Sequence, residues 1–384
     1  MTKFSKKKTF VTIVTEIFFF LCYDFNNIVC EIYNTTHIME VLMGARLSKE
    51  RFNDLLAVWS KDYIVSAPAL FKGAGSFSDT DQIRYKGVKT FEEIVFGEKS
   101  TFSHKEVLLP ITQQLFYFTE DETKEAKQNE DNYIVFLRSC DMHSVKRLDE
   151  MYLRNGFEDI YYKKFREKTK FIVMGCKTSF ENCFCVDMGT NKPVDHDGYI
   201  HAENDSVYID IINQDLLNGF TLTADENQTV THQFVEETQT RVNLPKNVDI
   251  SVAKSDMWDE YQIRCIGCGR CNFVCPTCTC FSMQDVAYTD NGKNGERRRV
   301  WASCHMDGFT DMAGGHSFRE NKGQRMRFKV LHKVYDYEKR FGYHMCTGCG
   351  RCDDVCPEYI SFANAINKLD GAMANLPTEA KEVN

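Results

Sequence analysis

The 384-residue chain lacks the usual sequence signatures of nucleotide, haem and acyl-transfer chemistry. No Gly-x-Gly-x-x-Gly follows a predicted strand, and neither Gly-x4-Gly-Lys-Ser/Thr nor the Cys-x2-Cys-His haem-attachment motif occurs. No Ser-His or His-Cys constellation indicates nucleophilic catalysis. A basic surplus is also missing, because 55 acidic residues face 47 basic ones, which argues against general binding to nucleic acid or anionic membranes. The chain is therefore poor in signals for a substrate site.

Cysteine, by contrast, is abundant, with 17 residues. Eight of them lie in two near-identical runs, residues 265–276 (CIGCGRCNFVCP) and residues 346–357 (CTGCGRCDDVCP). Both have the spacing Cys-x2-Cys-x2-Cys-x3-Cys-Pro that binds [4Fe–4S] clusters. Structural zinc typically takes four ligands as two separated pairs, so it explains this spacing poorly. We predict two [4Fe–4S] clusters and an electron-transfer role in a reducing cytoplasm, where thiols stay free to bind metal.

The fourth cysteine of each run is expected to cross to the other cluster, as in two-cluster proteins with this pattern. This crossing would also hold the two motifs together in space. One predicted ligand set is Cys265, Cys268, Cys271 and Cys356, and the other is Cys346, Cys349, Cys352 and Cys275.

Residues 1–42 form a doubtful leader. Three lysines at 6–8 precede an apolar run from Phe10 to Tyr23, which resembles a signal peptide but lacks a clear cleavage site. The run is too short and too interrupted to predict a membrane-spanning helix. We favour translation from upstream of the natural start, with Met39 or Met43 as the first residue.

Residues 43–255 are predicted to form a mixed α/β domain. Ser48 is expected to cap a helix whose apolar side includes Phe52 and Trp59. Short strand-like runs follow, including 83–85, 115–118 and 207–212, and residues 120–131 are expected to form an exposed loop. Strands at 133–137 and 171–174, with a helix between them, predict an α/β unit whose two loops share one sheet edge.

Four cysteines near that edge suggest a third [4Fe–4S] site: Cys140, Cys176, Cys183 and Cys185. Asp141 or His143 is a candidate to replace or orient one of these ligands. The alternative is that the four are small buried hydrophobic residues, as free cysteines often are.

Residues 256–370 are predicted to form a helical dicluster domain, with helices over 324–340 and 357–366 and a flexible tail over 371–384. The expected fold class is α+β. Cys278, Cys280 and Cys304 are expected to pack near a cluster, with ligation or redox exchange as the alternative. A basic stretch between the motifs is either a solvated face or a source of positive charge for clusters and partners: Arg297, Arg298, Arg299, Arg319, Lys322, Arg325, Arg327 and Lys329.

The segment from Cys265 to Ile366 closely resembles the A subunit of anaerobic sulfite reductase. The resemblance is carried by residues 276–281 (PTCTCF), 300–304 (VWASC), 313–319 (AGGHSFR) and 351–360 (RCDDVCPEYI). Residues 138–141 (RSCD) and 181–185 (ENCFC) are also similar to that family and to the β subunits of cytosolic sulfhydrogenases.

This resemblance implies a cytoplasmic three-subunit complex. A flavin- and NADH-binding subunit would supply electrons, this chain would relay them without itself acting on sulfite, and a sirohaem subunit would reduce sulfite to sulfide. Two alternatives remain open: a relay subunit of a sulfhydrogenase or heterodisulfide-reductase-like complex, and a redox-sensing cluster protein. Neither nucleic acid nor a membrane is an expected partner.

Overall fold

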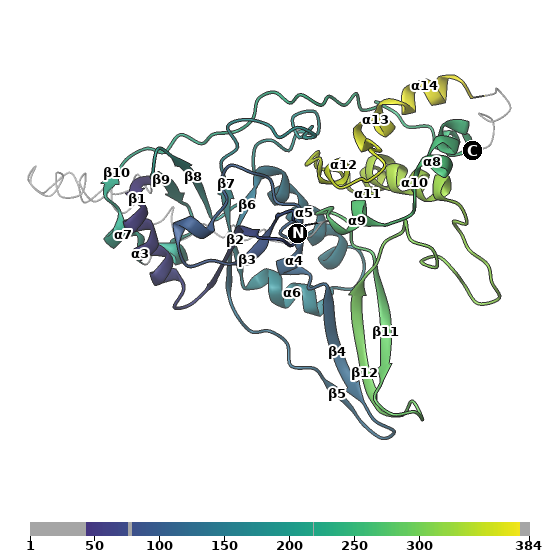
Figure 1. Ribbon diagram of the computed structural model, residues 1–384, viewed down its shortest axis with the longest axis horizontal. Helices are drawn as coiled ribbons and strands as arrows, with labels where there is room; N and C mark the ends of the chain where they lie inside the picture. Colours follow the sequence, from purple (N-terminus) through teal and green to yellow (C-terminus); the bar gives the residue numbers. More distant parts are fainter. Residues whose placement is uncertain (1–43, 76–78, 218, 377–384) are drawn as a thin grey trace, which may run out of the picture.

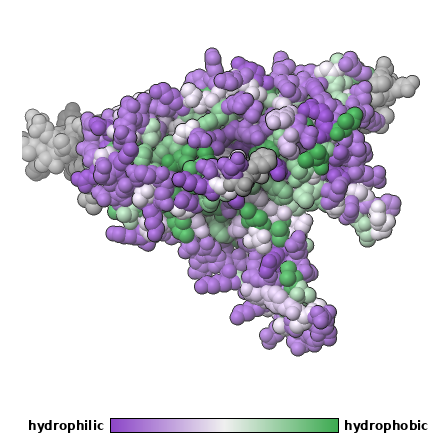
Figure 2. Space-filling view, in the orientation of Figure 1, coloured by the Kyte–Doolittle hydropathy of each residue, from purple (hydrophilic) through white to green (hydrophobic). Residues whose placement is uncertain are grey.

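The computed structural model describes residues 44–75, 79–217 and 219–376, so the leader predicted at the start of the chain lies outside the described residues. In these ranges the chain forms two β-sheets and a helical region (Figure 1). Most of the face shown in Figure 2 is hydrophilic, with separate apolar patches. No helix in the described ranges has the length and apolar character needed to cross a bilayer.

The larger sheet has eight strands in the order β10-β1-β9-β8-β7-β6-β2-β3. Its centre is parallel, from β2 through β6 and β7 to β8, and the outer strands pair antiparallel. The strands are β1 (Gly44–Ser48), β2 (Ile64–Phe71), β3 (Gln82–Gly87), β6 (Tyr133–Arg138), β7 (Thr169–Met174), β8 (Gly198–Glu203), β9 (Ser206–Ile211) and β10 (Glu226–Asn227).

The predicted strand–helix–strand unit is confirmed as β6, α5 (Ser139–Leu153) and β7. Both strands are almost wholly buried, because helices cover the two faces of the sheet. On one face lies α3 (Lys49–Trp59), which begins after the predicted cap Ser48 and packs Phe52 into the core. On the other face lie α5 and α6 (Ile160–Glu167). Residues 139–141 and 175–176 consequently follow neighbouring parallel strands at one sheet edge.

The smaller sheet crosses the predicted domain boundary at residues 255 and 256. Its order is β11-β12-β4-β5, formed by β4 (Thr112–Phe118), β5 (Thr123–Glu125), β11 (Phe281–Ala287) and β12 (Gly295–Trp301). Strand β12, from between the cysteine motifs, pairs antiparallel with β4 of the N-terminal part. The loop predicted at 120–131 therefore contains the short strand β5, although that strand is exposed.

The rest of the cluster region consists of helices and the loops between them (Figure 1). Its helices are α8 (Asp259–Arg264), α9 (Arg270–Phe273), α10 (Lys322–Leu331), α11 (Tyr337–Phe341), α12 (Arg351–Asp354), α13 (Phe362–Asn367) and α14 (Leu369–Ala374). A π-helical turn, η5 (His332–Asp336), joins α10 to α11, which confirms a helical stretch over 324–340. Shorter elements are α4 (Lys105–Leu108), α7 (Phe220–Thr223), η1 (Phe91–Glu93), η2 (Gln214–Leu216), η3 (Ile250–Lys254) and η4 (Asp256–Trp258).

The helix predicted from Pro357 instead begins at Phe362, so that part of the prediction is wrong. Ser361 caps it by accepting a hydrogen bond from the Asn364 backbone N–H at 3.1 Å, and residues 357–360 form a turn. The chain remains helical past Leu369 through α14, and residues 377–384 lie outside the described ranges.

Candidate metal centres

Each cysteine motif folds as a tight loop followed by one short helix. The loop glycines adopt left-handed backbone angles, with φ of 72° and 74° at Gly267 and Gly269 and of 64° and 71° at Gly348 and Gly350. Glycine populates this region without the steric cost that a side chain brings. The two motifs therefore have the same local fold, and their helices α9 and α12 pack against each other.

The motifs together line two cavities, each surrounded by one of the predicted ligand sets. The surface cavity is lined by Cys265, Cys268, Cys271 and Cys356, and the inner cavity by Cys275, Cys346, Cys349 and Cys352. In each of these sets, three cysteines come from one motif and the fourth from the other. Cys352, Lys329 and Phe362 line both cavities, so the cavities share a wall.

The two cavities differ in their access to solvent. Cys268 of the surface cavity is exposed, whereas Cys346 and Cys349 of the inner cavity are buried. Burial raises the pKa of Cys346 to about 12 and raises that of Cys349 as well. These thiols are therefore neutral on their own, and metal coordination is what would deprotonate them. In the described ranges, no three His, Cys, Asp or Glu side chains converge closely enough to hold a single metal ion.

Three lysines with little exposed surface lie among the cysteines of the cluster region: Lys105 (3% exposed), Lys329 (4%) and Lys333 (3%). None of their ammonium groups has a carboxylate within 4.0 Å among the residues that the structure describes. Burial alone would lower the pKa of Lys329, but Cys271 and Cys352 outweigh it and raise that pKa well above its usual value. A buried charge is costly unless it is paired, so this region is built for negative charge.

His305 is another buried group without a partner. Its ring nitrogens have no hydrogen-bond partner among the described residues, the side chain is buried, and it lines the surface cavity. Burial lowers its pKa to about 3, so the ring is neutral and carries one N–H donor. Acceptors such as cluster sulfides would satisfy it. The thiols, lysines and histidine therefore fit anionic iron–sulfur clusters.

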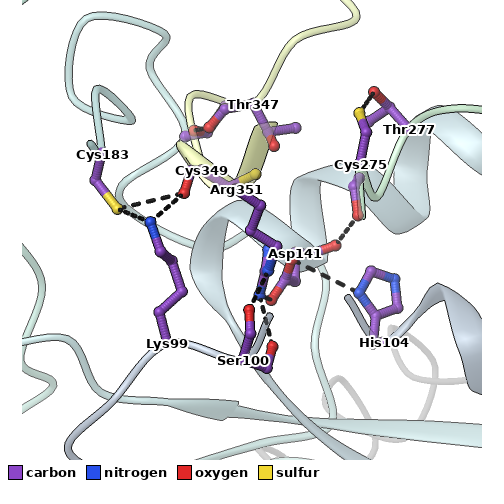
Figure 3. Close-up of polar contacts among 12 residues, drawn as sticks. Lys99, Ser100, His104, Asp141, Cys183, Cys275, Thr277, Thr347, Cys349 and Arg351 are labelled. Carbon is purple, nitrogen blue, oxygen red and sulfur yellow. Dashed lines mark hydrogen bonds and ion pairs between the residues drawn. The ribbon is translucent and has the colours of Figure 1, made fainter. Parts of the chain in front are cut away.

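Arg351, beside two inner-cavity cysteines, anchors the second motif to the α/β domain (Figure 3). Its guanidinium donates to both carboxylate oxygens of Asp141, at 2.6 and 2.8 Å, and to the Ser100 backbone oxygen at 2.9 Å. Arg351 and Asp141 are both buried. Burial works against the Asp141 carboxylate, but Arg351 and His104 together hold its pKa far below the usual range.

Three of the four cysteines predicted to form a third site, Cys140, Cys183 and Cys185, lie near the inner cavity. Cys183 and Cys185 are buried, and the Cys183 thiol donates to the Cys349 backbone oxygen at 3.4 Å. The Lys99 ammonium contacts the same oxygen at 3.1 Å (Figure 3). Burial raises the pKa of the Cys140 thiol well above its usual value, and the neighbouring Cys349 and Cys185 raise it further.

Two details of that prediction differ in the structure. Cys176 lines a separate cavity with Arg138, Phe180 and His201, and its thiol donates to the Thr178 backbone oxygen. The candidates for replacing a ligand are engaged elsewhere. Asp141 is paired with Arg351, and His143 Nε2 contacts the Lys192 backbone oxygen at 2.8 Å.

The remaining cysteines of the described ranges are Cys278, Cys280 and Cys304, which lie beside the first motif. The Cys278 backbone N–H donates to the Cys275 oxygen at 3.4 Å, and the Cys304 sulfur accepts from Asn272 Nδ2 at 3.0 Å. That they pack near a cluster stays a prediction. Sequence reasoning missed Lys105, Lys333 and the buried amide of Asn272 as neighbours of the thiols. The apolar spacing over residues 324–340 predicts a helix with one buried face, and Lys333 lies on that face. This spacing was the sequence signal available for Lys333.

Comparison with known proteins agrees with this geometry. Residues 264–360 match the family model described as a 4Fe-4S dicluster domain, which supports iron–sulfur clusters, two of them by that description. The chain is also similar to sulfhydrogenase 2 subunit beta of Pyrococcus furiosus, with 27% identity over 318 residues that span 75% of this chain and 90% of the relative. No solved structure matches the chain.

Proposed function

We propose that this chain is an electron-transfer subunit of a multi-subunit oxidoreductase and holds two [4Fe–4S] clusters. The observation that carries the proposal is the pair of adjoining cavities, each lined by three cysteines of one motif and by the fourth cysteine of the other, Cys356 or Cys275. When bound, such clusters supply one-electron transfer at potentials set by charge, hydrogen bonds and solvent exposure.

The residues around the two cavities define a path along which electrons can move between solvent and the inner cavity. Cys268 brings the surface cavity to solvent, where an external electron carrier can approach. The shared wall of Lys329, Cys352 and Phe362 separates the two cavities by single side chains. Lys329 and Lys333 provide positive charge that stabilises added electrons, and the apolar core around α10 and α13 excludes water.

Cys140, Cys176, Cys183 and Cys185 remain the proposed ligands of a third cluster. Support comes from the burial of Cys183 and Cys185 beside Cys349, which would put this cluster next to the inner cavity. The separate position of Cys176 requires the loop at 176–180 to move toward the other three cysteines.

For the complex, we propose an anaerobic sulfite reductase, with the flavin- and NADH-binding subunit and the sirohaem subunit as partners in the cytoplasm. This rests on the motif resemblance around residues 276–281, 300–304 and 313–319. The alternative is a sulfhydrogenase-like complex, which the name of the similar Pyrococcus furiosus protein favours.

Anaerobic co-purification with the products of neighbouring genes separates these two complexes. For a sulfite reductase, we expect a co-purifying sirohaem subunit and NADH-dependent conversion of sulfite to sulfide. A nickel–iron subunit together with hydrogen-dependent dye reduction would replace that assignment by the alternative. If the chain keeps its clusters but binds no partner and passes no electrons, the relay function itself is wrong.

A further inference from the structure

Two cysteines outside both ligand sets, Cys280 and Cys304, lie close together at the end of the β11–β12 hairpin. Their thiols interact, which lowers the pKa of Cys280 and raises that of Cys304. Cys304 is buried, and Cys280 is half-buried.

The smaller sheet determines this contact. Phe281 begins β11 and lies opposite Trp301, the last residue of β12. The Ala302 backbone N–H then donates to the Cys280 oxygen at 3.0 Å, which extends the pairing beyond the two strands. The two cysteines thus leave adjoining antiparallel strands at the end of the ladder, so their contact is built into the backbone.

A buried amide links this thiol pair to the first cluster motif. Asn272 lies between Cys271 and Cys275, and its Nδ2 donates to the Cys304 sulfur at 3.0 Å and to Ser303 Oγ at 3.0 Å. The pair is therefore separated from a proposed cluster ligand by one side chain of the motif.

A buried lysine, Lys105, lies next to the thiol pair and has no carboxylate partner in the described ranges. Lys105 Nζ donates to the backbone oxygens of Cys278 at 3.1 Å and Asn272 at 3.4 Å, and it lies 4.2 Å from the Trp301 ring centroid. Lys105 is 3% exposed, and no carboxylate lies within 4.0 Å of its ammonium group in the described ranges. Burial lowers the pKa of Lys105, whereas Cys275 and Cys278 outweigh burial and raise the pKa of Lys333. The Lys333 charge lowers the pKa of Cys280 and so favours its thiolate, the reactive form in disulfide exchange.

Cys280, the less buried member of the pair, lines a cavity of its own. Cys278 and Cys280 line a small cavity between the smaller sheet and the α/β domain, together with Tyr152, Arg299 and Trp301. Neither of the two cluster cavities includes these thiols in its lining. Cys280 therefore lines a cavity other than the two cluster cavities.

We propose that Cys280 and Cys304 form a redox-active dithiol–disulfide pair that exchanges two electrons with the clusters. The inference rests on the proposed function, because the clusters are its electron donors and acceptors. On oxidation, both S–H bonds break, one S–S bond forms, two protons leave, and two oxidised clusters each accept one electron. On reduction, two reduced clusters return one electron each, the S–S bond breaks, and each sulfur takes up one proton. The pair stores two electrons for a relay that otherwise moves them singly.

The test is differential alkylation of the intact, cluster-loaded chain under anaerobic conditions, at oxidising and reducing potentials. The chain is then unfolded in an excess of alkylating reagent, and the peptides are analysed by mass spectrometry. We expect a linked peptide pair containing Cys280 and Cys304 in the oxidised sample, and both cysteines alkylated in the reduced sample. Cys278→Ser should keep this change, whereas Cys304→Ser and Cys280→Ser should abolish it with iron and sulfide content unchanged.

Three results would overturn the proposal. In the first, both cysteines are alkylated equally at the two potentials. In the second, Cys304→Ser or Cys280→Ser loses about four irons per chain, which would make these cysteines cluster ligands. In the third, the linked peptide persists after the clusters are reduced. A wild-type chain without iron and sulfide would refute the proposed function as well, whereas a fully loaded chain without the linked peptide refutes this inference alone.

Discussion

At the scale of single residues, charge balance distinguishes this site from an ordinary protein core. Lys105, Lys329 and Lys333 are almost fully buried, yet thiols rather than carboxylates surround them. Spacing alone indicated the eight cysteines, because a cubane needs them at those positions. It could not separate the buried Lys329 from the exposed Arg297, which pairs with Asp285 on β11, because both belong to one basic stretch.

Replacing Lys329 by Met should lower the reduction potential of at least one cluster. At an effective dielectric of about 20, a unit charge ~6 Å away is worth roughly 3 kcal/mol, which corresponds to a shift on the order of 100 mV for one electron. Potentiometric titration followed by electron paramagnetic resonance measures the shift. Lys329→Arg should retain most of the wild-type potential, and Lys293→Met, at an exposed position between β11 and β12, is the control. An unchanged potential in Lys329→Met would show that this charge does not act on the clusters.

Removing one partner of the buried Arg351–Asp141 pair should strongly destabilise the protein. Arg351→Met leaves a buried carboxylate unpaired, a change that typically costs about 3–5 kcal/mol. Anaerobic thermal unfolding should show a drop of several degrees, and Asp141→Asn should lower the midpoint too. Arg154→Ala, which removes an exposed partner of Glu150, should change it little. Equal midpoints for Arg351→Met and Arg154→Ala would contradict this account of the anchor.

At the scale of elements, the loop of the second cysteine motif packs tightly against the loop at residues 182–185. A Cβ on Gly350 would lie 2.2 Å from the Asn182 backbone oxygen, and one on Gly348 would lie 2.6 Å from the Phe184 backbone. The Phe184 N–H donates to the Gly348 oxygen at 2.8 Å. Contact between the loop at 182–185 and the motif is therefore close enough to require glycine.

Gly350→Ala should consequently cost the chain its inner-cavity cluster. The matched control is Gly342→Ala, because Gly342 also has a positive φ of 81°, yet a Cβ added there would meet no atom within 4 Å. Both variants carry the left-handed backbone strain of roughly 1 kcal/mol, and only Gly350→Ala adds the clash. Iron content and thermal midpoint measure the difference. Comparable iron in the two variants would show that the loop contact is not needed for cluster binding.

Sequence patterns predicted the apolar elements of this fold better than the polar ones. The buried strands β6 and β7 and the capped helix α3 were predicted from continuous apolar runs and helical spacing. The hairpin of β11 and β12 was not predicted from the sequence, because its strands are rich in charged and exposed residues. Its pairing with β4 joins segments about 180 residues apart, which local patterns cannot indicate.

At the scale of the whole molecule, the cluster region meets solvent on the side of the surface cavity. Exposed apolar side chains lie near Cys265 in the sequence, with Ile263 83% and Ile266 58% exposed. Ile266 also lines the surface cavity. The smaller sheet and the Arg351 anchor hold the opposite side against the α/β domain. Electrons should therefore enter or leave through the surface cavity.

Ile263→Asp should weaken the functional contact with an electron-transfer partner without changing the iron content. We expect the KM for the partner to rise several-fold, because a charge would replace apolar surface beside the surface cavity, where electrons enter or leave. The control is Phe157→Asp, which alters a fully exposed side chain outside the cluster region. If both variants transfer electrons as the wild type does, the partner approaches elsewhere.

Iron and acid-labile sulfide per chain, measured with spectra of the reduced protein after anaerobic purification, test the central claim most directly. Two clusters predict about eight irons and eight sulfides, and occupation of the third site by Cys140, Cys176, Cys183 and Cys185 raises both to about twelve. Cys356→Ser and Cys275→Ser should each impair one cluster, since each removes a ligand that the other motif requires. One or two zinc ions per chain without acid-labile sulfide would contradict the account.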